Sequence, residues 1–297
     1  MNKHYWLWCM LLISITSCEK NITIVSPKAA EVLVVEATIE NGEYPIVLLS
    51  KSLDYFGKIS AVELNNSFVS NATVTISNGI LTHQLKEYIQ PITPTYSIKF
   101  YTINPANIAT AFKGVVNSNY SLTILAEGKT YTSTTTIPKI TRRIDSMYVA
   151  DLPPGNDTVW KRIFIKAYDQ PGLGDYIRYY TKQNSEQYLP GDPSVFDDAI
   201  IDGTQYQFEL PRGKDRNNPS PDGQYSSYFK KGDTVTFKNS NIDKATYDFW
   251  RTMEYTYQSI GNPFASPIKV LSNINGASAL GYFGGYASQY KTIIIPR

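Results

Sequence analysis

Short runs in which apolar and polar residues alternate dominate the chain, and this two-residue period is typical of β-strands with one buried face. Residues 31–39 (EVLVVEATI) and 72–77 (ATVTIS) show the pattern clearly. Asn41-Gly42 and Asn78-Gly79 follow these runs, and Asn-Gly is a strong hairpin-turn signal. Many short strands with such turns predict an immunoglobulin-like β-sandwich over 31–140.

A second β-rich domain is expected over 141–297, with the boundary near 138–145. The apolar stretch 159–169 (VWKRIFIKAYD) predicts a long strand there. Residues 184–203 and 211–223 are rich in Pro, Gly, Asn and Asp, a composition typical of loops.

One helix is predicted in this second domain, near residues 243–259. Asn241 or Asp243 can cap its first turn, because a short polar side chain accepts hydrogen bonds from free backbone N–H groups. Gly261 and Pro263 then end it. The stripe expected to pack on the sheet consists of Ala245, Phe249, Met253 and Tyr257.

The first eighteen residues differ from the rest. An apolar run at 5–13 lies between Lys3-His4 and Ile15-Thr16-Ser17-Cys18, and this arrangement is typical of a secretory signal. The run is too short to span a bilayer, which takes about 20 residues. Its end resembles a bacterial lipobox, which implies removal of 1–17, a lipid anchor with palmitate-type acyl chains on Cys18, and a polar tether over 18–30.

Charge and cysteine content exclude several classes of partner. Charged residues make up 18% of the chain and the net charge is +2, so we expect no nucleic-acid partner and no polybasic membrane anchor. Membrane attachment is therefore expected through the lipid on Cys18. The other cysteine, Cys9, lies in the signal, so the mature chain is expected to have no disulfide and no thiolate metal site.

The chain offers few groups for catalysis, and we expect neither enzymatic activity nor a cofactor. Besides His4 in the signal there is a single histidine, His83, in a predicted strand, whereas a Ser-His-Asp triad or an imidazole zinc site depends on such residues. The tract 281–286 (GYFGGY) is expected to be a close-packed strand, with glycine where another backbone approaches. A carboxylate-based hydrolase stays open, because glycoside cleavage needs only two acids. The acids considered for it are Glu186, Asp192, Asp197, Asp198, Asp202 and Glu209.

Calcium and glycosylation are two further alternatives, although the main expectation is a chain without metal. Oxygen ligands for calcium occur at Asp215-Arg216-Asn217 with Asp222-Gly223, or near Asp197-Asp198, without the twelve-residue loop pattern. Three Asp–hydroxyl–apolar triplets resemble the O-glycosylation acceptor of Bacteroidota envelope proteins. They are Asp145-Ser146-Met147, Asp157-Thr158-Val159 and Asp233-Thr234-Val235.

Tyrosine is abundant, with 23 residues, and supplies candidates for ligand binding. Most of these tyrosines are expected on ordinary exposed sheet faces. Aromatic side chains on loops of a rigid β-scaffold can bind a glycan or a peptide, since they offer large contact area at low entropic cost. The candidates are Tyr188, Tyr206, Tyr225 and Trp250.

Three stretches, in this order and together with the lipobox, resemble the Bacteroidota lipoproteins catalogued as the domain-of-unknown-function 4249 family. The stretches are 34–37 (VVEA) leading to 48–52 (LLSKS), 71–76 (NATVTI), and 261–264 (GNPF) with 272–274 (SNI) and 280–283 (LGYF). The resemblance covers nearly all of the mature chain. It implies an outer-membrane lipoprotein, often encoded beside a TonB-dependent receptor, and it implies no catalytic residues.

Three functions follow from these observations. The favoured one is a non-enzymatic accessory of a TonB-dependent outer-membrane transporter, which captures a ligand or docks on the transporter. The alternatives are a structural or adhesion surface lipoprotein and, less favoured, the carboxylate-based hydrolase. Localisation at the outer membrane is expected, while the membrane face stays open.

Overall fold

The computed structural model describes residues 31–53, 60–216, 218, 221–262, 264–266 and 268–297. The expected signal peptide at 1–17, the lipidation site Cys18 and the tether at 18–30 lie outside the described residues. Within the described ranges, no helix combines the length and apolar character needed to cross a bilayer.

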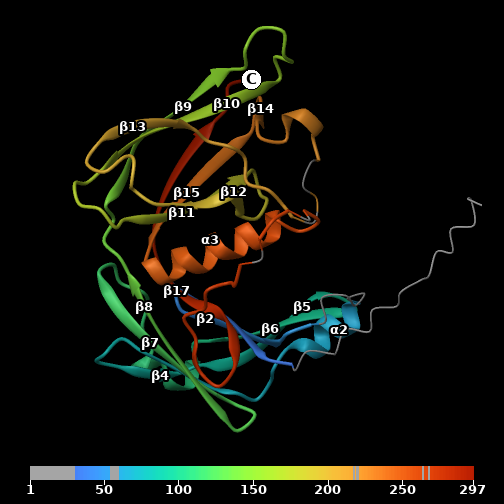
Figure 1. The fold of residues 1–297 in the computed structure, drawn as a ribbon, viewed down its shortest axis with the longest axis vertical. Helices are drawn as coiled ribbons and strands as arrows, with labels where there is room; N and C mark the ends of the chain where they lie inside the picture. Colours follow the sequence, from blue (N-terminus) through green and yellow to red (C-terminus); the bar gives the residue numbers. More distant parts are fainter. Residues whose placement is uncertain (1–30, 54–59, 217, 219–220, 263, 267) are drawn as a thin grey trace, which may run out of the picture. The chain divides into compact units, whose positions relative to one another are not determined.

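The largest sheet of the fold has eight strands, and these strands come from both halves of the sequence (Figure 1). The boundary expected near residue 140 falls between strands of other sheets, but this large sheet runs across it. From one edge to the other it contains β12 (Leu189–Phe196), β11 (Tyr176–Gln183), β15 (Thr234–Ile242), β17 (Ala279–Ile294), β1 (Leu33–Glu40), β2 (Ile46–Lys51), β6 (Tyr96–Thr102) and β5 (Lys86–Thr93).

Two smaller sheets complete the β-structure, so the expectation of a mainly β protein is confirmed. One contains β16 (Asn275–Gly276), β8 (Lys129–Ile137), β7 (Ser118–Ala126), β3 (Thr73–Ser77) and β4 (Thr82–Gln84). The other contains β13 (Gln205–Glu209), β10 (Trp160–Asp169), β14 (Phe229–Lys230) and β9 (Arg142–Asp151). Among the described residues, the helical elements are α2 (Ala61–Ser67), α3 (Lys244–Gln258), and the short 3-10 helices η1 (Pro105–Thr110) and η2 (Gly223–Tyr225).

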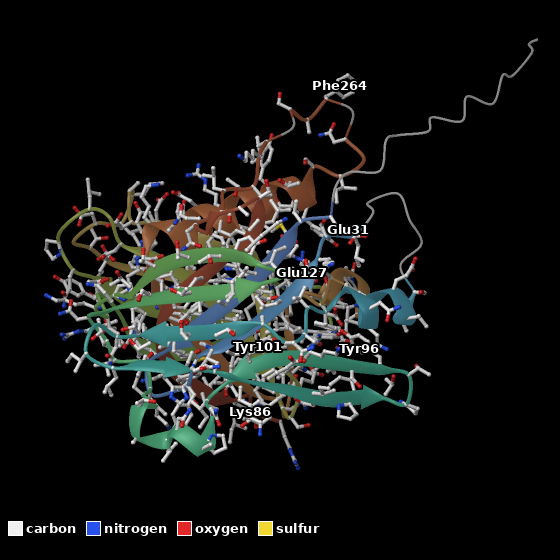
Figure 2. All side chains as sticks on the ribbon, turned by 90° about the horizontal axis from the view of Figure 1, so that it is seen from below. Glu31, Lys86, Tyr96, Tyr101, Glu127 and Phe264 are labelled. Atoms are coloured by element: carbon white, nitrogen blue, oxygen red, sulfur yellow. The ribbon has the colours of Figure 1, made fainter. Side chains whose placement is uncertain are left out.

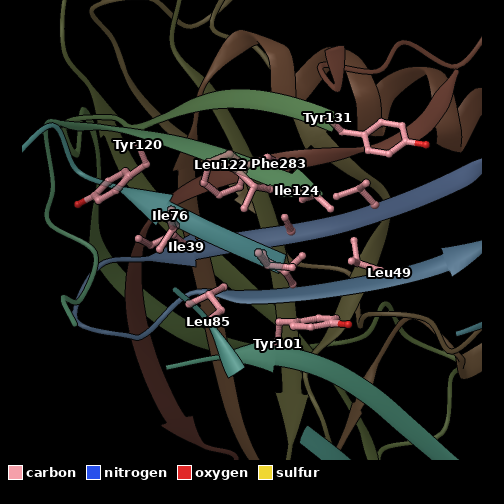
Figure 3. Packing of buried hydrophobic residues seen from close by; sticks show 14 of the residues in the cluster. Ile39, Leu49, Ile76, Leu85, Tyr101, Tyr120, Leu122, Ile124, Tyr131 and Phe283 are labelled. Atoms are coloured by element: carbon pink, nitrogen blue, oxygen red, sulfur yellow. The ribbon is translucent and has the colours of Figure 1, made fainter. Parts of the chain in front are cut away.

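The first core lies between the β1–β2 part of the large sheet and the five-stranded sheet. Alternate residues of β1, such as Val35 and Ile39, are fully buried and pack in one cluster with Ile76 of β3 and Leu122 and Ile124 of β7 (Figure 3). Burying each such side chain contributes about 1.5–3 kcal/mol, so this face fixes the register of the strands.

Tyr101 of β6 closes this core while keeping its hydroxyl satisfied. The ring is buried, and the hydroxyl donates to Glu87 Oε2 at 3.0 Å, with Val69 O 3.2 Å away as a second acceptor for the same proton. Figure 2 shows Tyr101 within the stack of strands, whereas Phe264 lies on an outlying loop after α3 and is 93% exposed.

The glycine-rich tract in β17 allows the close packing expected from the sequence. A Cβ atom at Gly285 would lie 2.3 Å from the carbonyl oxygen of Thr136, a residue of β8. Only a residue without a side chain fits between these backbones. β17 therefore joins the large sheet while touching the five-stranded sheet.

The single long helix of the described chain, α3, confirms the helix predicted near 243–259. Asp243 caps it, and its side chain accepts a hydrogen bond from Thr246 N at 2.8 Å. The predicted buried stripe was wrong in part, because Met253 and Tyr257 are 38% and 45% exposed. The buried positions, which face β12, β11 and β17, are Thr246, Tyr247, Phe249 and Glu254.

Candidate ligand-binding pocket

A cavity of about 610 Å³ lies beside β11, β12 and β15 and is bounded on another side by β13. This volume is within the range of about 300–1,000 Å³ that is typical of small-molecule sites. The residues that line it are Arg142, Ile177, Tyr179, Asp192, Pro193, Val195, Phe196, Asp197, Ile200, Ile201, Tyr206, Gln207, Phe208, Glu209, Pro211, Phe237 and Tyr247.

Aromatic rings in mutual contact form the wall of the pocket. Tyr179 lies 6.0 Å from Phe196 and 6.0 Å from Phe237, measured between ring centroids. Phe237 in turn meets the edge of Phe208 at 6.2 Å, and Phe208 stacks on Tyr206 at 6.0 Å. Such contacts hold the rings in fixed orientations, so the wall is preformed for a ligand with an apolar or ring-shaped part.

Gly191 of β12 makes room for the central ring of this wall. A Cβ atom at position 191 would lie 2.0 Å from Cζ of Tyr179. Glycine at this position therefore allows the Tyr179 ring to lie flat against the strand.

Acidic side chains at the pocket are held by neighbouring groups. Asp197 accepts a hydrogen bond from the hydroxyl of Tyr247 at 2.8 Å, and burial together with this contact raises the pKa of Tyr247 to about 12. Asp192 accepts from Gln258 Nε2 at 2.7 Å. The hydroxyl of Tyr247 thus stays protonated at physiological pH and holds the Asp197 carboxylate by this hydrogen bond.

Of the four aromatic residues predicted to bind a ligand, Tyr206 lines this pocket and the other three lie elsewhere. Tyr188 lies at the large sheet, with its ring 6.0 Å from Tyr290 and the Lys238 ammonium 5.8 Å from its centroid. Tyr225 stacks on Trp160 at 5.2 Å. The structure therefore does not bring the four together.

Trp250 has a structural environment in α3. The guanidinium of Arg178 lies 3.3 Å from the Trp250 ring centroid, and Trp250 Nε1 donates to the Tyr286 hydroxyl at 3.1 Å. Arg178 is only 4% exposed, so the ring faces a buried cation. Trp250 therefore packs on side chains of β11 and β17, and this packing accounts for a tryptophan at this position.

The acids considered for a hydrolase are divided among different surroundings. Asp192, Asp197 and Glu209 line the pocket, while Glu186 lines a separate cavity of about 400 Å³. Asp202 accepts from Gly172 N at 2.6 Å, a contact within the loops.

Asp198 is buried and its Oδ2 accepts from Gly174 N at 2.8 Å and Asp175 N at 2.9 Å. Both donors are backbone amides of the turn before β11. The side chain of Asp198 thus links two loops.

His83 also has a structural environment. It lies in β4, as predicted, with Nδ1 2.8 Å from Thr110 Oγ1 and Nε2 accepting from Asn104 N at 2.9 Å. The ring is 1% exposed, and this burial lowers the pKa of His83. Both ring nitrogens therefore tie η1 to the sheet.

The loop proposed for calcium at 215–223 is engaged by basic groups. Asp222 accepts from Arg212 Nη1 at 2.7 Å and Lys230 Nζ at 3.0 Å. Burial alone would raise the pKa of Asp222, but these hydrogen bonds and charges outweigh it and lower the pKa. Asn217 lies outside the described residues.

The three triplets proposed for glycosylation differ in accessibility. Asp157 and Thr158 are exposed in the loop before β10. Asp233 is 9% exposed and accepts from Lys230 N at 2.8 Å and Asn184 Nδ2 at 3.0 Å. Ser146 is half-buried within β9. The loop triplet at 157–159 is therefore the most accessible to a modifying enzyme.

The sequence pattern did not identify three aromatic residues of the pocket wall, because they occupy ordinary strand positions. These residues are Tyr179, Phe208 and Phe237. Their alternation with polar residues is the same whether a ring faces packed side chains or a cavity.

Comparison with known families places the chain. The model of the family described as "Domain of unknown function (DUF4249)" matches residues 19–292, in agreement with the resemblance noted in the sequence. No curated protein matches the chain significantly. Because the family match covers almost the whole chain, the protein belongs to the DUF4249 family of unknown function.

Proposed function

We propose that this protein is a non-enzymatic cell-envelope lipoprotein of Bacteroidota that captures a ligand for a TonB-dependent outer-membrane transporter. The observation that carries this proposal is the preformed pocket of about 610 Å³ with its aromatic wall. A site of this size with few polar groups is suited to holding a ligand rather than to surface contact alone.

The chemistry of the pocket favours an amphipathic ligand. The rings of Tyr206, Phe208 and Tyr179 offer faces for a sugar ring or an apolar peptide side chain. Asp197 and the hydroxyl of Tyr247, which also line the pocket, offer polar groups for hydrogen bonds. A glycan or a peptide, the ligand classes expected from the sequence, can use both kinds of contact.

Attachment and partner are proposed from the sequence. The lipobox that ends in Cys18 supports a lipid anchor in the outer membrane. Family membership supports a TonB-dependent receptor as partner, since lipoproteins of this resemblance are often encoded beside one. The pocket would then hold cargo until the receptor takes it.

A probe-binding experiment tests the pocket. The full chain in detergent micelles is titrated with 1-anilinonaphthalene-8-sulfonate, an apolar fluorescent anion, beside the Phe196→Ser and Phe264→Ser variants. Phe196 stacks on Tyr179 at the pocket, whereas Phe264 is exposed on the outlying loop (Figure 2).

We expect Phe196→Ser to weaken probe binding about tenfold, in line with the loss of roughly 1–1.5 kcal/mol of ring contact. Phe264→Ser should bind like the unmodified chain. Equal probe affinities for the two variants would contradict the assignment of the pocket. If Phe196→Ser weakens probe binding as expected, native mass spectrometry of protein purified from its own outer membrane would identify the natural cargo by its added mass.

A further inference from the structure

Three aspartates from separate segments meet beside the pocket. Asp169 ends β10, Asp175 precedes β11, and Asp198 follows β12. One carboxylate oxygen from each lies within 4.8 Å of the others. The fold therefore concentrates negative charge where the three strand ends converge.

A single cation offsets this charge only in part. Arg142 Nε donates to Asp169 Oδ1 at 3.0 Å, and this is the one salt bridge that the three carboxylates make among the residues described. Three carboxylates beside one guanidinium leave a net charge of −2. Asp169 and Asp198 are 0% and 3% exposed, so water cannot screen this charge well.

Burial and mutual repulsion disfavour this concentration of negative charge. Asp175 and Asp198 repel Asp169, and Asp202 adds to the repulsion on Asp175. A bound cation would compensate the cluster.

A buried oxygen atom without a hydrogen-bond partner is a second observation that points to a cation site. Asp169 Oδ2 is buried and receives no hydrogen bond from any residue that the structure describes. Asn241 Oδ1 is likewise buried without a hydrogen-bond partner. The Nδ2 atom of Asn241 donates to Thr141 Oγ1 at 2.7 Å, and Thr141 in turn contacts Asp175. Buried oxygens of this kind are normally satisfied, and a carboxylate oxygen is a ligand that hard cations prefer.

We propose that Asp169, Asp175 and Asp198 bind a calcium ion. Each carboxylate presents one oxygen within 4.8 Å of the other two, so a single cation can lie among the three. The +2 charge neutralises the net charge of the cluster. Backbone amides at Gly174 and Asp175 already orient the Asp198 carboxylate through its Oδ2. Water would complete the coordination shell.

The site would fasten two loops to each other. Asp198 belongs to the loop that carries Ile200 and Ile201 at the pocket, and Asp175 belongs to the turn before β11. A cation between them holds that loop against the sheet. This stabilising role is independent of what the pocket binds.

Calorimetric titration with calcium chloride tests the proposal on the full chain after chelator treatment. The variants are Asp175→Asn and Asp198→Asn, each of which removes one ligand charge. The matched control is Asp145→Asn, an exposed aspartate on β9 outside the cluster. Thermal unfolding is followed with and without calcium for each protein.

We expect one calcium per chain and a rise in Tm of roughly 5 °C at saturating calcium. Asp175→Asn and Asp198→Asn should weaken binding by at least about 10–100-fold, the loss seen even for outer-shell changes. Asp175→Asn without calcium should keep a Tm at or above that of the unmodified chain, because it removes a repelling charge. This result separates loss of binding from loss of the fold.

Several outcomes would overturn the proposal. They are the absence of saturable calcium binding by the unmodified chain, equal weakening by Asp145→Asn, or magnesium binding as tight as calcium binding. The last result would replace calcium by a smaller cation, because magnesium demands Mg–O bonds of about 2.0–2.1 Å.

Discussion

Gly281 of β17 lies directly beside Val35 of β1, and a Cβ atom at position 281 would come within 1.8 Å of the Val35 carbonyl oxygen. Gly281 also has a φ of +101°, a backbone conformation that favours glycine. The two residues are partners in the parallel pairing of β1 with β17. This contact joins the beginning and the end of the described chain in one sheet.

Gly281→Ala is therefore expected to destabilise the whole fold. Overpacking and the unfavourable φ together cost roughly 2–5 kcal/mol. Urea unfolding followed by circular dichroism measures the loss. Gly79→Ala is the matched control, since Gly79 has a φ of +87° but nothing within 4 Å of the added Cβ. A loss no larger than that of Gly79→Ala would show that β1 and β17 do not pack this closely.

His83 gives the fold a pH dependence of known sign. Its folded-state pKa is lowered by burial, so its stabilising contribution is present above the ordinary value of 6.5 and is lost as the pH falls through the lowered value. The free energy of unfolding should fall between pH 7.5 and pH 5 more steeply for the unmodified chain than for His83→Gln. Parallel pH profiles for the two proteins would contradict this role.

Truncation of Trp250 and of Tyr206, both aromatic candidates from the sequence, should affect different properties: stability for Trp250 and probe binding for Tyr206. Trp250→Ala exposes the buried Arg178 guanidinium and is expected to cost about 3 kcal/mol of stability without altering the pocket. Tyr206→Ala removes part of the pocket wall and should weaken binding of the fluorescent probe about tenfold. Both variants are measured by unfolding and by probe titration. Weakened probe binding by Trp250→Ala but not by Tyr206→Ala would place the ligand beside α3.

Thr158 is the hydroxyl most open to glycosylation, because its loop is exposed while Ser146 is half-buried in a strand. Intact-mass analysis of protein from the native organism should show a glycan that Thr158→Ala removes. Ser146→Ala serves as control and should leave the added mass unchanged. An unmodified mass for the native protein would rule out glycosylation at this triplet.

Local features of this fold could be predicted from the sequence because their causes are local. Alternation at 31–39 and 72–77 marks β1 and β3, and the side-chain cap at Asp243 marks the start of α3. The parallel pairing of Val35 with Gly281 could not be predicted, since no local signal joins residues so distant. For the same reason the sequence could not show that one sheet contains strands from both expected domains.

Of the residues that line the pocket, the sequence indicated Tyr206 as a binding residue and Asp192, Asp197 and Glu209 as candidate acids. Phe237 is a buried strand residue in the same pattern as any core residue, and only the arrangement of β13 and β15 shows that it borders a cavity. Trp250 was misleading in the opposite way, because a large aromatic residue near loops suggests recognition until the buried Arg178 beneath it is seen. Whether a charged side chain such as Arg178 is buried depends on tertiary contacts, and these cannot be read from a sequence pattern.

Affinity purification of the tagged, lipidated protein from its own outer membrane, followed by mass spectrometry, tests the proposed function most directly. We predict a TonB-dependent receptor in stoichiometric amount, together with cargo that is lost in the Phe196→Ser variant. Recovery of the protein alone, under conditions that preserve known receptor complexes, would contradict a transport role and favour adhesion.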